Sequence, residues 1–153
     1  MYTKVLVPLD GSTFSECSLS HVKAISLGCN VPEVILLRVV EPLSTNEIAA
    51  LARLKGDSIN QVEEAKKAEA TEYISNEANK LNKEGLKVIG TILEGNAAEK
   101  ILDYAANNVD LIIMSTHGRS GISRWAMGSV ADRVARHSAV PVLLISPPGC
   151  RNE

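Results

Sequence analysis

Aromatic residues are scarce in this sequence of 153 residues, where they make up only 3% of the chain. Proteins that bind single-stranded nucleic acid stack the bases on exposed aromatic rings, so this shortage disfavours that class of function. An excess of positive charge is also missing, because the formal net charge is −2 and the isoelectric point is about 5.9. A general affinity for DNA, RNA or anionic membranes is therefore not expected.

Cysteines are few, and Cys17, Cys29 and Cys150 form no C-x-x-C pair. Their spacing predicts neither a zinc site nor a disulfide framework, and three unpaired thiols are typical of a reducing compartment. No apolar run approaches the roughly 18 residues of a membrane span. The opening stretch MYTKVLVPLD lacks the pattern of a secretory signal. Together these absences predict a cytoplasmic, soluble protein that has no membrane partner.

Aliphatic side chains are abundant, and they gather in five short runs that predict β-strands. The runs are Lys4–Leu9, Val34–Val40, Leu86–Leu93, Leu111–Met114 and Val140–Ile145. Four of them are nearly continuous in apolar residues, which indicates strands buried on both faces, as in a parallel sheet covered by helices. The run LKVIGTIL is more mixed, as an edge strand would be.

Helical patterns separate these runs. Thr13 and Glu16 form a capping box that predicts the start of a helix ending at Gly28. Ser129 and Asp132 form a second capping box, which opens a helix running to about residue 137. Further helical patterns lie in part of Glu41–Asp57, over Ser58–Glu84 and over Ala97–Asn108.

The alternation of these elements predicts an α/β fold. Such an order implies a single doubly wound (Rossmann-like) five-stranded parallel sheet, with right-handed crossovers and helices on both faces. No linker, internal repeat or low-complexity segment interrupts it, so one domain is expected over residues 1–147, followed by a tail over residues 148–153.

Two loops of this predicted fold carry the chemistry of a binding site. In open parallel sheets, ligands bind beyond the carboxyl ends of the strands, where the strand order reverses. The loop PLDGS follows the first run, and the loop STHGRSGISRWAMGS follows the fourth. If the first and fourth strands are neighbours, these loops face each other across one crevice.

The second loop has the composition of a phosphate-binding segment. Its glycines let the backbone approach a phosphate closely or adopt positive φ, and a helix start at Gly128 would offer amide donors and a positive dipole end. The hydroxyl of Ser129 and the charge of Arg119 or Arg124 are candidate phosphate ligands. In the first loop, Asp10 could accept hydrogen bonds from a ribose hydroxyl or an adenine edge.

Each of these residues also has a purely structural interpretation. Ser129 as a helix N-cap is worth about 1 kcal/mol without any ligand. Asp10 and Gly11 form an ordinary turn pair, and His117 could simply orient the loop. Taken singly, the residues favour these interpretations; taken together on a βαβ scaffold, they favour a binding site.

The chain also resembles the universal stress protein (UspA) superfamily over essentially its whole length. The stretches that carry the resemblance are KVLVPLDGS, ILLRVVEP, GNAAEKILDYAANNVDLIIMSTHGRSG and RWAMGSVADRVARHSAVPVLLI. The ATP-binding branch of that family has the motif G-x2-G-x9-G-[S/T]. Gly118, Gly128 and Ser129 match it, whereas Ser115 stands at the first glycine. If the loop demands positive φ there, a serine costs on the order of 1 kcal/mol.

The resemblance implies a stress-response protein that binds ATP or a related adenine nucleotide, with or without Mg²⁺, and acts as a nucleotide-dependent regulatory dimer. It implies that Asp10 and the backbone near Val39 and Val40 hold adenosine, while the motif glycines and Ser129 hold ribose and phosphates. The full set of implied binding residues is Pro8, Asp10, Val39, Val40, Met114, Ser115, His117, Gly118, Arg119, Gly128, Ser129 and Val130. The last strand of such proteins commonly pairs with its copy, which implies a homodimer through Val140–Ile145.

Two other classes of function stay open. One is a dimeric adaptor or structural stress protein that binds no nucleotide, as the serine at position 115 would favour. The other is an enzyme, but the sequence has no Walker A lysine loop, G-x-G-x-x-G fingerprint or H-E-x-x-H motif. Slow ATP hydrolysis is the most that is expected.

Overall fold

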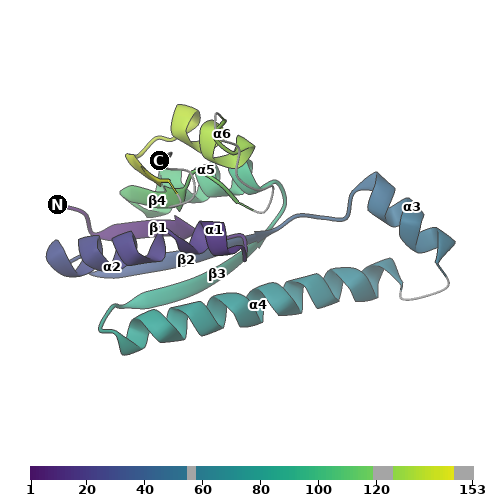
Figure 1. Cartoon of the computed structure of the whole chain (residues 1–153), viewed down its shortest axis with the longest axis horizontal. Helices are drawn as coiled ribbons and strands as arrows, with labels where there is room; N and C mark the ends of the chain where they lie inside the picture. The colour runs from purple at the N-terminus through teal and green to yellow at the C-terminus, as the bar shows by residue number, and fades with distance from the viewer. Residues whose placement is uncertain (55–57, 119–125, 147–153) are drawn as a thin grey trace, which may run out of the picture.

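The described residues of the computed structural model, 1–54, 58–118 and 126–146, form a sheet of five parallel strands (Figure 1). The order in the sheet is β3-β2-β1-β4-β5. The bounds are β1 Lys4–Pro8, β2 Glu33–Val40, β3 Val88–Glu94, β4 Leu111–Ser115 and β5 Val142–Ile145. Because the chain continues to opposite sides of β1, the sheet is doubly wound, as the sequence predicts.

The central strand β1 is apolar because it is buried between two neighbouring strands. After Lys4 all of its residues are buried, and it pairs with β2 along its whole length and with β4 at Val5 and Leu6. The mixed strand β3 pairs with β2 and lies at an edge, where Ile89 remains 45% exposed. The prediction of an edge strand is therefore confirmed. The composition of β3 is mixed because an edge position buries only part of each face of the strand.

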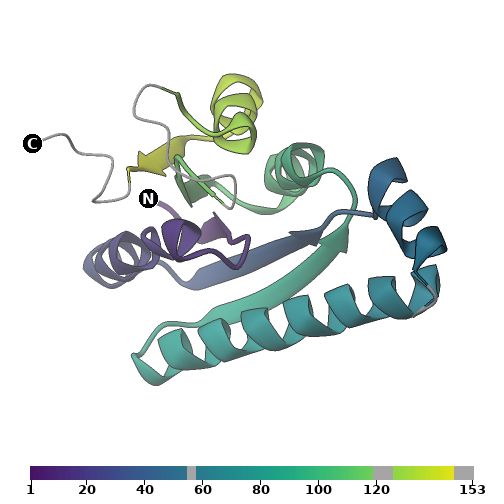
Figure 2. The ribbon, with the colours of Figure 1, turned by 45° about the vertical axis from the view of Figure 1, so that its right-hand side comes forward.

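Helices cover both faces of the sheet (Figure 2). Their bounds are α1 Thr13–Glu16, α2 Leu19–Gly28, α3 Thr45–Arg53, α4 Ile59–Lys83, α5 Ala97–Asn108 and α6 Ser129–His137. On one face, Val22 of α2 and Ile74 of α4 pack against alternate side chains of the strands. On the other face, Ile101 of α5 and Val134 of α6 pack against the remaining set. Two buried clusters thus sandwich the sheet.

The long helix α4 packs closely because β3 contains a glycine. A Cβ at Gly90 would lie 2.5 Å from Cγ2 of Ile74, so the absence of a side chain lets α4 approach the edge of the sheet. The buried face of α4 begins only at Ala70, whereas Val62 is half-buried and Ala65 exposed. The first part of α4 runs past the sheet beside α3 (Figure 1), so only the second half of the helix has a buried face.

The first predicted helix is divided into two. Its N-cap is Ser12, whose hydroxyl accepts a hydrogen bond from the amide of Ser15, so the predicted capping box at Thr13 is wrong by one residue. The break after Glu16 coincides with hydroxyls that donate to the preceding turn, from Ser15 to the carbonyl of Ser12 and from Ser18 to that of Ser15. Side-chain bonds of this kind bend helices.

The last helix also begins differently from the prediction. Gly128 is its N-cap and makes no side-chain cap, so Ser129 is the first helical residue rather than a capping residue. The amide of Gly128 donates to the carbonyl of Thr116 at 2.8 Å, which holds the start of α6 against the end of β4. This tertiary contact, rather than a capping box with Asp132, sets where the helix begins.

None of the helices in the described part of the chain is long and apolar enough to cross a membrane.

Candidate functional site

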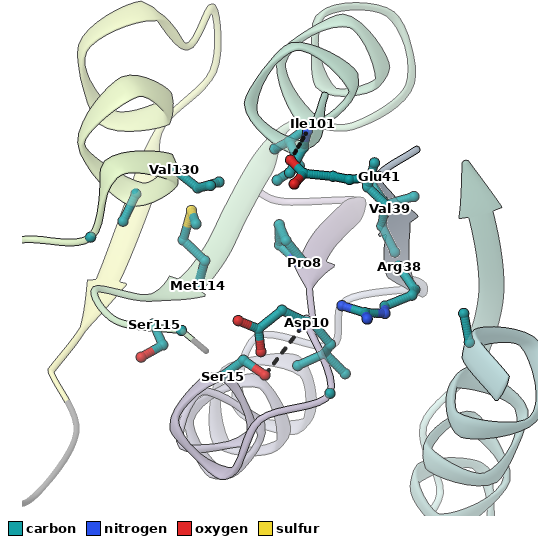
Figure 3. Close-up of a pocket in the computed structure, with 18 of the residues that line it drawn as sticks. Pro8, Asp10, Ser15, Arg38, Val39, Glu41, Ile101, Met114, Ser115 and Val130 are labelled. Carbon is teal, nitrogen blue, oxygen red and sulfur yellow. Dashed lines mark hydrogen bonds between the residues drawn. The ribbon is translucent and has the colours of Figure 1, made fainter. Parts of the chain in front are cut away.

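A pocket of about 460 Å³ opens at the carboxyl ends of β1, β2 and β4. Its walls come from the loop after β1, the end of β2, the loop after β4 and the first turn of α6. Figure 3 shows Met114, Pro8 and Val130 on one side of Asp10 and Arg38 on the other. The two loops singled out in the sequence therefore do face one crevice, because β1 and β4 are neighbours in the sheet.

The structure brings together the predicted binding residues that it describes. Those lining the pocket are Pro8, Asp10, Val39, Val40, Met114, Ser115, His117, Gly118, Gly128, Ser129 and Val130. Arg119 lies outside the described residues, as does Arg124. The residues come from four separate segments of the chain, so their meeting is a property of the fold.

Asp10 is held in a defined orientation by the residues that follow it. Its Oδ1 accepts hydrogen bonds from the amide of Ser12 at 2.9 Å and from the hydroxyl of Ser12 at 2.6 Å. The amide of Asp10 donates to the hydroxyl of Ser15 at 3.3 Å. These bonds form the turn that the sequence suggested, and the same turn places a carboxylate in the pocket.

The motif glycines permit close approach rather than unusual backbone angles. A Cβ at Gly118 would collide with Oδ2 of Asp10, and a Cβ at Gly128 would lie 3.0 Å from the carbonyl oxygen of Thr116. Neither glycine is among the described residues with positive φ. Gly118 therefore lets the segment after β4 contact the loop after β1, and Gly128 lets the start of α6 lie against Thr116, because neither position has a side chain.

Ser115 occupies the first motif position without strain. It is the last residue of β4 and does not have positive φ, so the energetic cost considered for a left-handed serine does not arise. Its hydroxyl accepts a hydrogen bond from the amide of His117 at 3.3 Å. Figure 3 shows this hydroxyl turned away from Asp10.

The side chain of His117 connects residues on either side of Gly118. Its side chain is buried, Nε2 lies 3.0 Å from the carbonyl of Ala126, and Nδ1 lies 2.8 Å from the hydroxyl of Thr116. A carbonyl only accepts, so Nε2 carries the proton in that contact. The bond spans the segment between the two glycines and supports the interpretation of His117 as a residue that orients the loop.

The sequence analysis missed one wall of the pocket. Residues of β2 and α4 complete it, with Arg38, Glu41, Lys66, Glu69 and Tyr73 contributing charged and polar side chains. Arg38 gave the only signal in the sequence, as a charge inside the apolar run VILLRVV. Glu41 directly follows β2, whereas Lys66, Glu69 and Tyr73 belong to α4, whose orientation over the pocket no local pattern specifies.

Three side chains of this wall, Glu41, Lys66 and Tyr73, make hydrogen bonds to the backbone or to α1. Lys66 donates from Nζ to the carbonyl of Glu41 at 3.1 Å, and Glu41 in turn accepts from the amide of Ala97 at 3.2 Å. The hydroxyl of Tyr73 donates to Glu16 at 2.8 Å. Burial, and then the hydrogen bond to Glu16, raise the pKa of Tyr73, so its hydroxyl stays protonated and remains a donor.

Comparison with known proteins identifies the relatives of this chain. A model of the universal stress protein family matches residues 1–146. The chain belongs to the universal stress protein family. Universal stress protein MJ0577 of Methanocaldococcus jannaschii is 34% identical in a match that covers 95% of this chain and 95% of the relative. Universal stress protein YxiE of Bacillus subtilis is 26% identical, covering 95% of this chain and 99% of the relative.

Solved structures of universal stress proteins share the fold. The structure of MJ0577 superposes with a TM-score of 0.80 at 32% identity and covers 100% of this chain and 99% of its own. The structure of UspA from Lactobacillus plantarum gives a TM-score of 0.77 at 22% identity, covering 94% of this chain and 97% of the other. The five-stranded parallel sheet is therefore the architecture of this universal stress protein, as the resemblance implied.

Proposed function

We propose that this universal stress protein binds an adenine nucleotide, ATP or a close relative, in the pocket at the carboxyl end of the sheet. The observation that carries the proposal is the contact between the two loops, where Gly118 lies against the Asp10 carboxylate and Gly128 lies at the start of α6. One pocket thereby combines an acceptor suited to ribose hydroxyls with an amide-lined helix start suited to phosphates.

The apolar part of the pocket suits the base. Val39 and Met114 are buried among the apolar residues packed under α5 and α6, and Val130 lies beside them. In this proposal adenine lies against these side chains and meets the backbone near Val39 and Val40. Most of the surface of a small ligand is buried by such apolar walls, while a few polar groups orient it.

The phosphates belong at the start of α6. Because Gly128 rather than Ser129 is the N-cap, the hydroxyl of Ser129 is not required for capping and lies in the exposed first turn. The helix has nine residues, and its first amides and dipole favour negative charge. Ser129 then adds a hydroxyl donor to the amides of the same turn.

A magnesium ion would come with the nucleotide rather than be held by the protein. In the described part of the chain there is no group of three or more His, Cys, Asp or Glu side chains that could hold a metal ion. Mg²⁺ keeps several waters and commonly takes its remaining ligands from phosphates and one or two carboxylates.

Distant members of the fold support the choice of ligand class. A universal stress protein solved in complex with cAMP superposes with a TM-score of 0.64 at 20% identity. A universal stress protein family protein from Arabidopsis thaliana solved with AMP bound superposes with a TM-score of 0.60 at 18% identity. Both ligands are adenine nucleotides, although they differ in their phosphates, so the adenosine part is the better supported half of the proposal for this chain.

We further propose that the protein acts in the cytoplasm as a homodimer whose conformation responds to nucleotide occupancy. The support for the dimer is β5, an edge strand with Leu143 36% exposed, which would be an aggregation hazard if nothing covered it. A ligand that binds one arrangement of the glycine loop better would stabilise that arrangement, which gives occupancy a structural readout.

Isothermal titration of the purified protein with AMP, ADP and ATP, with and without Mg²⁺, tests the proposal. Asp10→Asn keeps an oxygen for Ser12 but replaces one carboxylate oxygen by an amide donor, so we expect affinity to fall about tenfold or more. Asp103→Asn, an exposed change on α5 away from the pocket, is the matched control and should bind as the wild type does. No binding of any of these nucleotides at millimolar concentration would refute the proposal and favour the adaptor alternative.

A further inference from the structure

Tyr73 lines the pocket, but the proposed nucleotide contacts give it no role. It lies on α4, is half-buried, and donates from its hydroxyl to Oε1 of Glu16 at 2.8 Å. Glu16 is the last residue of α1, which lies next to Asp10 in the chain and in space. A hydrogen bond therefore ties the long helix at the edge of the sheet to the short helix that follows the Asp10 loop.

The short helix α1 depends on such ties. It has only four residues, and an isolated helix of that length does not persist in water, because nucleation costs more than a few internal hydrogen bonds return. Its position must come from tertiary contacts. The bond from Tyr73 to Glu16 supplies one at its C-terminal end, and the half-buried location of Tyr73 protects that bond from competition with water.

The other end of α1 holds Asp10. Ser12 is the N-cap, and its hydroxyl accepts from the amide of Ser15 at 3.2 Å while donating to Oδ1 of Asp10 at 2.6 Å. Ser15 is buried, and its hydroxyl accepts from the amide of Asp10 at 3.3 Å. The first turn of the helix and the Asp10 side chain therefore form one hydrogen-bonded unit.

The two carboxylate oxygens of Asp10 have different surroundings within this unit. Oδ1 receives both bonds from Ser12, at 2.9 Å from the amide and 2.6 Å from the hydroxyl. Oδ2 is turned toward Gly118, on the side of the pocket where the glycine loop begins. The orientation of Ser12 therefore determines where Oδ2 points.

We infer that Tyr73 and Glu16 are positioning residues, which hold α1 and, through Ser12, the carboxylate of Asp10. In that orientation the carboxylate makes the pocket select ribonucleotides over nucleotides that lack ribose hydroxyls. The inference rests on the proposed function and adds that the ribose hydroxyls are the part of the nucleotide that the pocket recognises. A fixed acceptor rejects an analogue that lacks the hydroxyl, because the acceptor is then desolvated without a partner. A loosely held carboxylate discriminates less.

The test compares the affinities of ATP and 2′,3′-dideoxy-ATP for the wild type, Tyr73→Phe and Tyr104→Phe. We expect the wild type to bind ATP at least tenfold more tightly than the dideoxy compound. Tyr73→Phe keeps the ring that lines the pocket and removes the hydroxyl. It should therefore lower the affinity for ATP about three- to tenfold and leave the affinity for the dideoxy compound within about twofold of the wild-type value. Tyr104, on α5 and outside the pocket lining, is the matched control and should change neither affinity.

Glu16 variants separate positioning from a general loss of packing. In Glu16→Gln the amide oxygen can still accept from Tyr73, so ATP affinity should be retained, whereas Glu16→Ala should reproduce the effect of Tyr73→Phe. The double variant Glu16→Ala with Tyr73→Phe should bind ATP no more weakly than either single variant, because the two substitutions remove the same hydrogen bond. Circular dichroism at the titration temperature establishes that each variant is folded.

The possible results distinguish this inference from the proposed function. If the wild type binds neither compound, the proposed function fails and this inference fails with it. If the wild type binds both compounds equally, or if Tyr73→Phe weakens both equally or neither, nucleotide binding stands and the positioning role of Tyr73 is refuted. A selective loss of ATP affinity in Tyr73→Phe, with rescue in Glu16→Gln, supports it.

Discussion

Replacing Gly118 by alanine tests the contact on which the pocket depends. The new Cβ would collide with Oδ2 of Asp10 and lie 3.3 Å from its Cγ. Gly118 is not among the described residues with positive φ, so alanine suits the backbone and any loss must come from the collision. Either the loop after β4 moves away from β1, or the carboxylate moves away from the loop.

The structure sets the size of the effect. If the carboxylate moves, it leaves Ser12, whose amide and hydroxyl bind Oδ1 at 2.9 and 2.6 Å. A hydrogen bond to a charged group contributes about 1.5–3 kcal/mol, and changing glycine to alanine returns about 0.4–1 kcal/mol by restricting the unfolded chain. Losing one such bond therefore predicts a net destabilisation of about 1–2 kcal/mol. In a chain of this length that lowers Tm by roughly 2–8 °C.

Thermal unfolding followed by circular dichroism measures this change, and nucleotide titration measures its effect on the site. The control is Gly28→Ala at the end of α2, where a Cβ would meet nothing within 4 Å. We expect this control to melt at or slightly above the wild-type temperature and to bind nucleotide normally. If Gly118→Ala melts with the wild type and binds ATP with unchanged affinity, the packing of Gly118 on Asp10 does not shape the pocket.

Two further predictions concern parts of the molecule outside the pocket. Burial alone would raise the pKa of Asp110, but hydrogen bonds from Thr3 and from the amide of Lys4 lower it below its usual value. The carboxylate thus stabilises the fold above its unfolded pKa of about 3.9, and this contribution is lost as the pH falls through the lower folded pKa. Asp110→Asn should therefore lower Tm at pH 7 but not at about pH 2, and an equal difference at both pH values would contradict this cause. For the dimer, Leu143→Asp on β5 should convert the protein to a monomer in light scattering, whereas a wild type that is already monomeric at micromolar concentration would refute the pairing.

The strands were predictable because each one is buried in a way that leaves a mark on the sequence. The ends of the five runs differ from those of the observed strands by no more than two residues. Continuous apolar runs mark the three inner strands, but the run at β5 is equally apolar although this strand lies at the second edge, so composition distinguished only the edge strand of residues 86–93. Right-handed crossovers limit the possible strand orders, but the sequence left the adjacency of the first and fourth strands as a hypothesis, and the structure decided it.

The helix starts were less predictable because several neighbouring residues can cap. Ser12 and Thr13 are adjacent hydroxyl residues, and the choice between them depends on Asp10, which takes the hydroxyl of Ser12 into its own hydrogen bonds. Ser129 has the right chemistry for a cap, but the bond from Gly128 to Thr116 places the helix start one residue earlier. In both cases a contact outside the helix decided between nearly equivalent local solutions.

By itself the sequence determined the alternation of strands and helices, and with it the edge of the sheet at which a ligand can bind. It also placed Asp10 and the motif glycines at that edge, because loops at strand ends are local features. Only the tertiary structure decided that Gly118 lies against Asp10, and that Tyr73 reaches Glu16 from 57 positions along the chain. Such contacts depend on how helices pack over a sheet, and packing is set by the shapes of many side chains at once, which no short pattern of residues records.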